Sequence, residues 1–166
     1  MPATPKQFMP LIATVFILLF LWLSTVPIMS WYELSGQHQE LQDAEFQWFH
    51  KGHSNYNFEI EIMAGSSPPD TAPIRIYVRD SELAFAYRVD DEEPVDISNM
   101  QHLPQTIDDS FQFISRLLEE RPRYLTVEYD AAFSYPKRIV VGRSENPVDE
   151  IIYSIRWFEP EFDDAP

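Results

Sequence analysis

Residues 74–89 read IRIYVRDSELAFAYRV, and this stretch predicts a β-hairpin. Residues 74–79 alternate isoleucine or valine with arginine or tyrosine, which is the period of a half-buried strand. After two polar residues the alternation returns, and its members are Leu83, Phe85, Tyr87 and Val89. Two polar residues between two such runs are typical of a tight hairpin turn, so we expect Asp80 and Ser81 at its tip.

Four more stretches show the same strand-like alternation of apolar and polar residues. They are residues 56–63, 125–130, 139–141 and 151–157. Two further stretches have the three-to-four spacing of an amphipathic helix, and these are residues 31–51 and 107–120. Gly52 is placed to end the first helix and Thr106 to cap the second.

The order of these elements is helix, three strands, helix, three strands. Because the connections are short, this order predicts an α+β fold with an antiparallel sheet of about six strands and two helices packed on one face. We expect this domain over residues 31–160, followed by a disordered acidic tail at 161–166. We expect a transmembrane helix ahead of it, within residues 1–30.

The membrane prediction depends on residues 9–29, which contain no charged side chain. A helix of this length measures about 31 Å, close to the hydrocarbon thickness of about 30 Å. A cleaved signal peptide is the alternative, although the apolar run is longer than usual for one and Ile28-Met29-Ser30 is a poor cleavage site. We therefore expect residues 1–30 to form a short cytoplasmic tip and an uncleaved anchor.

Charge predicts the orientation of this anchor. Lys6 is the only charged side chain before the apolar run, whereas all 27 acidic residues follow it. The positive-inside rule then keeps the N-terminus in the cytoplasm. We expect a single-pass protein of the bacterial inner membrane whose body faces the periplasm or the cell exterior. Secretion after signal cleavage is the alternative.

The composition excludes several classes of function. The 166 residues contain no cysteine, which excludes disulfides, thiolate metal sites and cysteine nucleophiles. A net charge of −15 without a basic patch makes nucleic acid a poor partner. Neither a glycine-rich phosphate loop nor a G-x-S-x-G or H-E-x-x-H motif occurs. We expect no cofactor, and as partners the membrane and another envelope protein.

Several short motifs of the body resemble a known family. They are Trp48 ahead of Asn55-Tyr56-x-Phe58, Ile76-x-Val78-x-Asp80, Thr106-Ile107-Asp108 ahead of Phe111 and Ile114, Val127-Glu128-Tyr129-Asp130, Tyr135-Pro136-x-x-Ile139, and Asp149-Glu150 ahead of Tyr153-x-Ile155. In this order, over about residues 48–158, they resemble a family of small bacterial envelope proteins catalogued as domain of unknown function 6174. The resemblance implies an extracytoplasmic location and no known activity.

The chain departs from this family in two places. Family members often carry cysteines after the first strand, where this chain has Met63-Ala64-Gly65. They favour glycine after the aspartate of the hairpin turn, where this chain has Ser81. Many relatives resemble lipoproteins, whereas this chain lacks the lipobox cysteine and carries the apolar segment instead.

Two groups of residues could in principle hold a metal ion. His50 and His53 lie three apart, but Gly52 should separate their rings, which favours two exposed loop histidines. The densest acidic cluster lies in one loop and consists of Asp90, Asp91, Glu92, Glu93 and Asp96. It lacks the spacing and the glycine of a calcium loop, which favours a solvated loop.

No residue is predicted to be catalytic, cofactor-binding or metal-binding. The family motifs nominate four residues as interaction candidates, and these are Asp130, Tyr135, Asp149 and Glu150. Turn and hairpin roles account for the same residues at least as well.

Two functions are compatible with these patterns. The first is a membrane-anchored extracytoplasmic binding or assembly module of the cell envelope, which presents a sheet face or an acidic loop to another component. The alternative is a hydrolase that acts on an envelope polymer through carboxylates alone, which needs two of them across a cleft. The lack of a catalytic motif favours the binding module over an enzyme.

Overall fold

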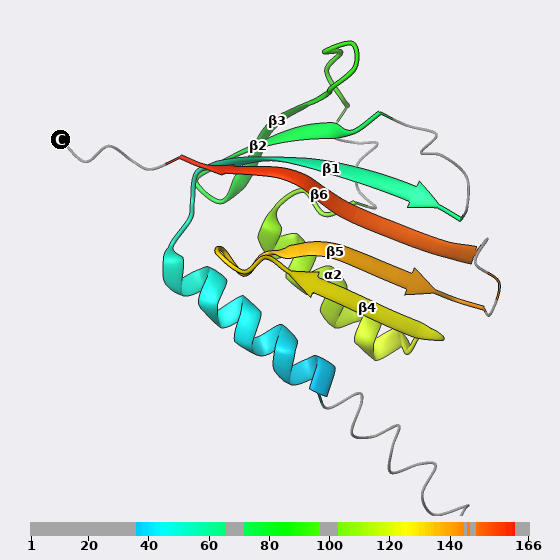
Figure 1. Cartoon of the computed structure of the whole chain (residues 1–166). Helices are drawn as coiled ribbons and strands as arrows, with labels where there is room; N and C mark the ends of the chain where they lie inside the picture. Colours follow the sequence, from blue (N-terminus) through cyan, green and yellow to red (C-terminus); the bar gives the residue numbers. More distant parts are fainter. Residues whose placement is uncertain (1–35, 66–71, 97–102, 145, 147–148, 162–166) are drawn as a thin grey trace, which may run out of the picture. The chain divides into compact units, whose positions relative to one another are not determined.

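The structure is a computed structural model of the chain, and it describes residues 36–65, 72–96, 103–144, 146 and 149–161 (Figure 1). The chain divides into two compact units. The first is Met1–Gln39, of which residues 36–39 are described and helical. The second is Glu40–Pro166, which holds every strand described below.

The predicted membrane segment, residues 9–29, lies outside the described residues. Within the described part of the chain, no helix is long and apolar enough to cross a bilayer. Of the expected acidic tail only Glu161 is described, and its backbone N–H donates to the carbonyl oxygen of Asn55 at 2.9 Å.

The N-terminal helix is described from residue 36 to residue 51. Its buried side chains are Leu41, Ala44 and Trp48, which recur at the three-to-four spacing of one helix face. Gly52 follows with a φ of +67°, the left-handed conformation that ends a helix at low cost when the residue is glycine. The predicted helix over 31–51 is confirmed for its described part.

The sheet has six strands, and each pairs antiparallel with its neighbours in the order β3-β2-β1-β6-β5-β4. The strands are β1 (Tyr56–Ala64), β2 (Ile74–Arg79), β3 (Glu82–Arg88), β4 (Tyr124–Tyr129), β5 (Pro136–Gly142) and β6 (Glu150–Pro160). The predicted antiparallel sheet is therefore confirmed, and the first and last strands of the chain meet at its centre.

Helix α2 (Ile107–Glu120) connects the two halves of the sheet. Thr106 caps it through its hydroxyl, and the carboxylate of Asp109 accepts the N–H of Thr106 in return, which completes the predicted capping box. Arg121 follows in the left-handed conformation and ends the helix. One face of α2 is buried, and it consists of Ile107, Ser110, Phe111, Ile114, Leu117 and Leu118.

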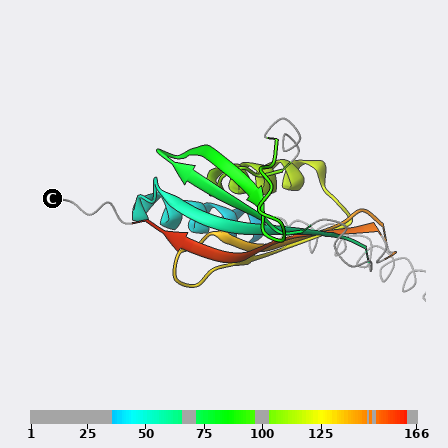
Figure 2. The same ribbon diagram turned by 90° about the horizontal axis from the view of Figure 1, so that it is seen from above.

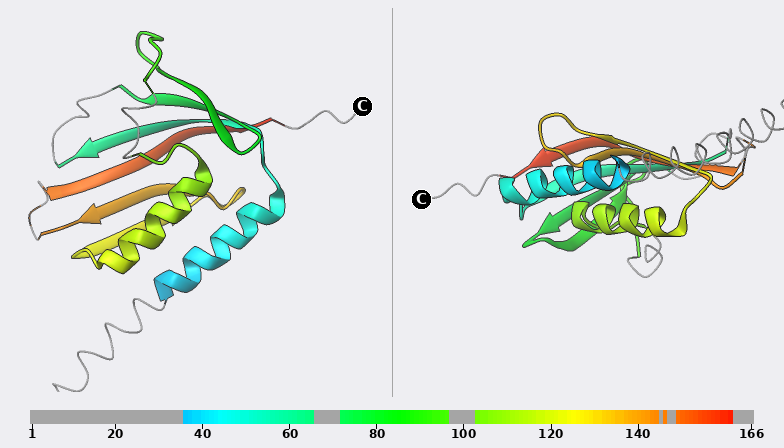
Figure 3. Two further views of the ribbon diagram at one scale, coloured as in Figure 1. Left: turned by 180° about the vertical axis from the view of Figure 1, so that it is seen from behind. Right: turned by 90° about the horizontal axis from the view of Figure 1, so that it is seen from below.

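Both helices lie on the same side of the sheet, as Figures 2 and 3 show. We call the sheet face toward the helices the inner face and the opposite one the outer face. The core lies between the helices and the inner face, where Phe58, Ile76 and Val78 are fully buried. Neither helix covers the outer face.

Two β-bulges reverse the predicted facing of three aromatic side chains. In β3 the extra residue is Ala84, because Val78 pairs with Leu83 but Tyr77 pairs with Phe85. Leu83 therefore faces the core, whereas Phe85 and Tyr87 face outward. Their expected place on one face with Leu83 is wrong, because a bulge shifts the period-two pattern by one residue.

The second bulge lies in the central strand β6. Ile60 pairs with Ile155 but Glu59 pairs with Trp157, so Arg156 is the extra residue. Ile155 is buried in the core, while Trp157 lies on the outer face beside Glu59. Here too the simple alternation from Ile155 to Trp157 fails at the bulge.

Candidate functional site

The two bulges bring aromatic and charged side chains together on the outer face. The pairing places Trp157, Glu59, Arg75 and Tyr87 in one row across β6, β1, β2 and β3. Tyr77 and Phe85 pair in the neighbouring row. We call these six residues the outer-face cluster, and they are Glu59, Arg75, Tyr77, Phe85, Tyr87 and Trp157.

Arg75 is the centre of the cluster. Its Nε donates to Glu59 Oε1 at 2.9 Å, Nη2 donates to the same oxygen, and Nη1 donates to Tyr87 Oη at 3.2 Å. Its guanidinium carbon lies 4.7 Å from the ring centroid of Trp157, within cation–π range. The hydrogen bond with Glu59 raises the pKa of Arg75, which fixes its positive charge.

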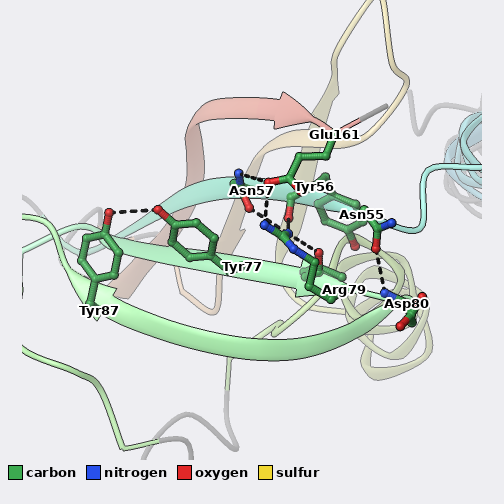
Figure 4. A network of polar contacts seen from close by, with 9 residues as sticks. Asn55, Tyr56, Asn57, Tyr77, Arg79, Asp80, Tyr87 and Glu161 are labelled. Atoms are coloured by element: carbon green, nitrogen blue, oxygen red, sulfur yellow. Dashed lines mark hydrogen bonds and ion pairs between the residues drawn. The ribbon is translucent and has the colours of Figure 1, made fainter. Parts of the chain in front are cut away.

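The aromatic rings form a second part of the cluster. Tyr77 and Phe85 stack with centroids 4.1 Å apart and planes inclined by 13°. The hydroxyl groups of Tyr77 and Tyr87 lie 3.2 Å apart, and this hydrogen bond raises the pKa of Tyr77 (Figure 4). Phe85 remains 50% exposed, so a large apolar ring is presented to solvent on the outer face.

A polar network borders the cluster at the end of β2 (Figure 4). Arg79 Nη1 donates to Asn57 Oδ1 at 3.0 Å, and Asn57 Nδ2 donates to Glu161 Oε1 at 3.0 Å. Arg79 also forms an ion pair with Glu161 and lies 5.7 Å from the ring centroid of Tyr77. These bonds connect β1, β2 and the residue that follows β6. They therefore hold the three strands together beside the aromatic rings.

The edge of the sheet next to the cluster is covered by the chain itself. After β3 the chain turns back, and Pro94 forms a bridge with Tyr87. Val95 N–H donates to the carbonyl of Ala86 at 3.0 Å, and Arg88 N–H donates to the carbonyl of Glu93 at 3.0 Å. Part of the backbone along the free edge of β3 is therefore already paired.

Two of the nominated residues, Asp130 and Tyr135, meet in the β4–β5 turn. The carboxylate of Asp130 accepts the backbone N–H groups of Ala132 and Phe133, each at 2.9 Å. The carbonyl of Tyr135 accepts the N–H of Asp130 at 2.9 Å, and its ring is buried against Phe158. Burial raises the pKa of Tyr135 to about 12, with a smaller effect from the charge of Asp130.

The other two, Asp149 and Glu150, lie at the far end of β5, where β6 begins. Glu150 accepts a hydrogen bond from the hydroxyl of Tyr124, and Asp149 accepts one from Ser144. The ring of Tyr124 lies directly over Gly142. The structure thus places the four nominated residues in two separate pairs, neither of which is part of the outer-face cluster.

The acidic loop converges on an arginine. Arg88 forms ion pairs with Asp90 at 3.9 Å, with Asp91, and with Glu93 at 3.0 Å. The hydrogen bond from Arg88 lowers the pKa of Asp91. Arg88 thus places one positive charge among these five acidic residues and contacts three of them.

The two histidines make different contacts. The ring of His50 stacks on Phe46 with centroids 5.1 Å apart, whereas His53 packs against Trp48, Phe133 and Phe158. Desolvation, and then the charge of Lys51, lower the pKa of His53. In the part of the chain that the structure describes, no group of three His, Asp or Glu side chains is arranged to hold a metal ion.

A family profile matches residues 40–160, and its description is Family of unknown function (DUF6174). The chain belongs to this family. The match confirms the resemblance seen in the motifs, and the DUF6174 region contains all six strands and every residue of the outer-face cluster. No curated protein and no solved structure matches the chain significantly.

Sequence reasoning missed the outer-face cluster, although one signal was present. In β2 the polar positions hold Arg75, Tyr77 and Arg79, and these long side chains can interact across strands more strongly than serine or lysine would. The partners Phe85, Tyr87 and Trp157 could not be assigned to the same face, because nothing in the sequence marks Ala84 or Arg156 as bulged.

Proposed function

We propose that the chain is a non-catalytic binding or assembly module of the bacterial cell envelope that uses its outer-face cluster to bind another envelope component. The observation that carries this proposal is the pair of bulges that turn Phe85, Tyr87 and Trp157 away from the core. Bulges that re-aim side chains are over-represented next to functional sites. If the only role of the sheet were to cover the core, burial of these rings would stabilise the fold more than their exposure does.

The construction of the cluster supports binding. Arg75 is held by Glu59, Tyr87 and Trp157, so its position is fixed before any partner arrives. Pre-organised aromatic and arginine side chains are the residues that contribute most to recognition surfaces, because little conformational entropy is lost when they bind.

Residues 9–29 support the envelope location. The uncharged length suits a membrane span, and the single lysine before it suits an orientation with the body outside the cytoplasm. In this proposal the anchor holds the module at the inner membrane, and the domain reaches into the periplasm or the cell exterior. A form secreted after signal cleavage would carry the same binding surface.

The hydrolase alternative finds less support. It needs one carboxyl group that keeps its proton and a second that is ionised nearby. On the outer face Glu59 forms an ion pair with Arg75, and Glu61 forms one with Arg156 at 3.1 Å, so each of these carboxylates already has a partner within the chain. Asp108, in the first turn of α2, has a pKa raised by burial, but it accepts the indole N–H of Trp48.

Protease accessibility tests the location. Protease added to spheroplasts should digest the body, and the full-length protein should stay in the membrane pellet after an alkaline wash. Protection from the protease would contradict the proposed orientation. Release of the full-length chain by the wash would contradict the anchor, whereas release of a chain lacking about the first 30 residues would support the secreted form.

A further inference from the structure

We infer that the outer-face cluster binds an uncharged polysaccharide, whose sugar rings lie against the half-exposed Phe85 and the partly exposed Trp157 and whose hydroxyl groups bond to Arg75 and Glu59. This inference rests on the proposed function, because it names the partner of the same surface. Three features of the cluster point to this ligand, and they concern its rings, its charges and the covered edge of the sheet.

The aromatic rings of the cluster match the polarity of a sugar ring. The face of an aromatic ring is apolar and carries partial negative charge, which suits the slightly positive C–H groups on the face of a pyranose ring. Phe85 is half exposed and stacks against Tyr77 of the neighbouring strand, so its ring is held in place before a flat partner binds. Trp157 offers a second ring two strands away from β2, beside Glu59.

The polar groups of the cluster suit hydroxyl groups. Arg75 supplies guanidinium donors and Glu59 supplies carboxylate acceptors in the same row, and a sugar hydroxyl can both donate and accept. The side chain of Arg75 is 30% exposed and that of Glu59 is 14% exposed, so both can be reached from solvent. Hydrogen bonds that involve a charged group are stronger than those between neutral groups.

The charges of the surface favour a neutral ligand. Arg75 is balanced by Glu59 and Arg79 by Glu161, so this part of the surface carries little net charge. The chain as a whole has a net charge of −15 and would repel a polyanion. A polycation would have no reason to prefer this balanced surface over the acidic remainder. An uncharged polymer with many hydroxyl groups is not repelled by the negative charge of the chain, and it is not drawn to the acidic remainder of the surface.

The covered edge argues against an extended peptide. Peptides that bind to a sheet usually add a strand at its edge through unpaired backbone groups. Beside the cluster that edge is β3, where Val95, Pro94 and Glu93 already occupy backbone positions. Beside Ala86, Tyr87 and Arg88 the ligand is therefore held by side chains on the face, as a sugar chain would be.

Binding of defined oligosaccharides tests the inference. The full chain is prepared in a detergent without a sugar headgroup and titrated with cellohexaose and with the hexamer of N-acetylglucosamine, and an oligogalacturonate serves as the anionic comparison. We expect at least one neutral hexamer to bind more tightly than the anionic one. Phe85→Ala and Trp157→Ala should each weaken binding about fivefold or more, from the loss of one aromatic contact.

A matched control separates the surface from exposed aromatic residues in general. Phe46 lies on the N-terminal helix and is 66% exposed, so Phe46→Ala removes a ring that is at least as accessible as Phe85 and should leave affinity unchanged. The inference is overturned if neither neutral hexamer binds, if the anionic one binds more tightly, or if all three variants behave alike. Cross-linking of a protein partner from position 85 without any sugar binding would overturn it too, while the proposed function would stand.

Discussion

The phenolic oxygen of Tyr56 accepts a hydrogen bond of 3.0 Å from the backbone N–H of Ile107, and both residues are buried. Tyr56 is the first residue of β1 and Ile107 is the first residue of α2. The N–H groups in the first turn of a helix have no partner within the helix, so this bond satisfies one of them from the centre of the sheet. It also fixes where α2 begins above the inner face.

Tyr56→Phe should lower the free energy of unfolding by about 1–3 kcal/mol, because it leaves the buried N–H of Ile107 without its acceptor. Urea unfolding of residues 31–166 measures the loss. Tyr87→Phe is the matched control, since its hydroxyl lies on the half-exposed outer face and water can replace it. Equal losses in the two variants would contradict the role assigned to the Tyr56 hydroxyl.

Phe111→Ala should cost about 3–5 kcal/mol, because Phe111 is almost fully buried in the stripe of α2 and lies against Tyr129. The same unfolding experiment applies. Phe85→Ala removes the same side chain from the outer face and should cost about 1 kcal/mol or less. If Phe111→Ala cost no more than Phe85→Ala, the assignment of the inner face would be wrong.

Gly142→Ala should destabilise the end of the sheet that carries Glu150. A Cβ at position 142 would lie 2.1 Å from the ring of Tyr124, so the ring must swing away and its hydrogen bond to Glu150 is lost. We expect a lower free energy of unfolding, because relief of the clash displaces the ring of Tyr124. In a Tyr124→Ala background the same substitution should cost little, and a double-mutant cycle measures this difference.

Gly36→Ala serves as the control for position 142. Gly36 is helical, and no atom lies within 4 Å of the Cβ position there. Alanine has the higher helix propensity, so the variant should be neutral or slightly more stable. A clear loss at position 36, or none at position 142, would contradict the prediction.

Stability should fall as the pH drops below about 6.5 because of His53. Burial, and then the charge of Lys51, hold the pKa of His53 below its usual 6.5 in the folded chain. The unfolded chain therefore takes up the proton first as the pH falls, which favours unfolding until the pH passes the lower pKa of the folded chain. His53→Gln should reduce this pH dependence, whereas His50→Gln should keep it. Identical pH profiles of stability for His53→Gln and the unchanged chain would rule out this role of His53.

Most of the fold could be predicted from local patterns. The turn at Asp80 and Ser81 has positive φ values of 52° and 64°, as a tight hairpin requires, and the capping box at Thr106 forms as its spacing indicated. These features depend on a few neighbouring residues, so the sequence alone contains the information. The pairing of β1 with β6 could not be predicted this way, because it joins strands about 100 residues apart.

The candidate site was largely hidden from sequence reasoning. Ala84 and Arg156 are the extra residues of the two bulges, and neither has a side chain that signals a bulge. The family motifs instead pointed to Asp130 and Glu150, which the structure places at hairpin positions at opposite ends of β5. Local motifs thus identified turns, while the cluster depended on long-range register.

Photo-cross-linking in intact cells tests most directly whether the outer face is the binding surface. A benzophenone side chain at position 85 would lie on the outer-face cluster, and the same group at position 46 would lie on the exposed side of the N-terminal helix. Because benzophenone reacts with C–H bonds of any neighbour, it reports a sugar or a protein equally. We predict a discrete adduct from position 85 that is absent from position 46. Adducts from position 46 alone, or from neither position, would contradict the assignment of the outer face as the binding surface.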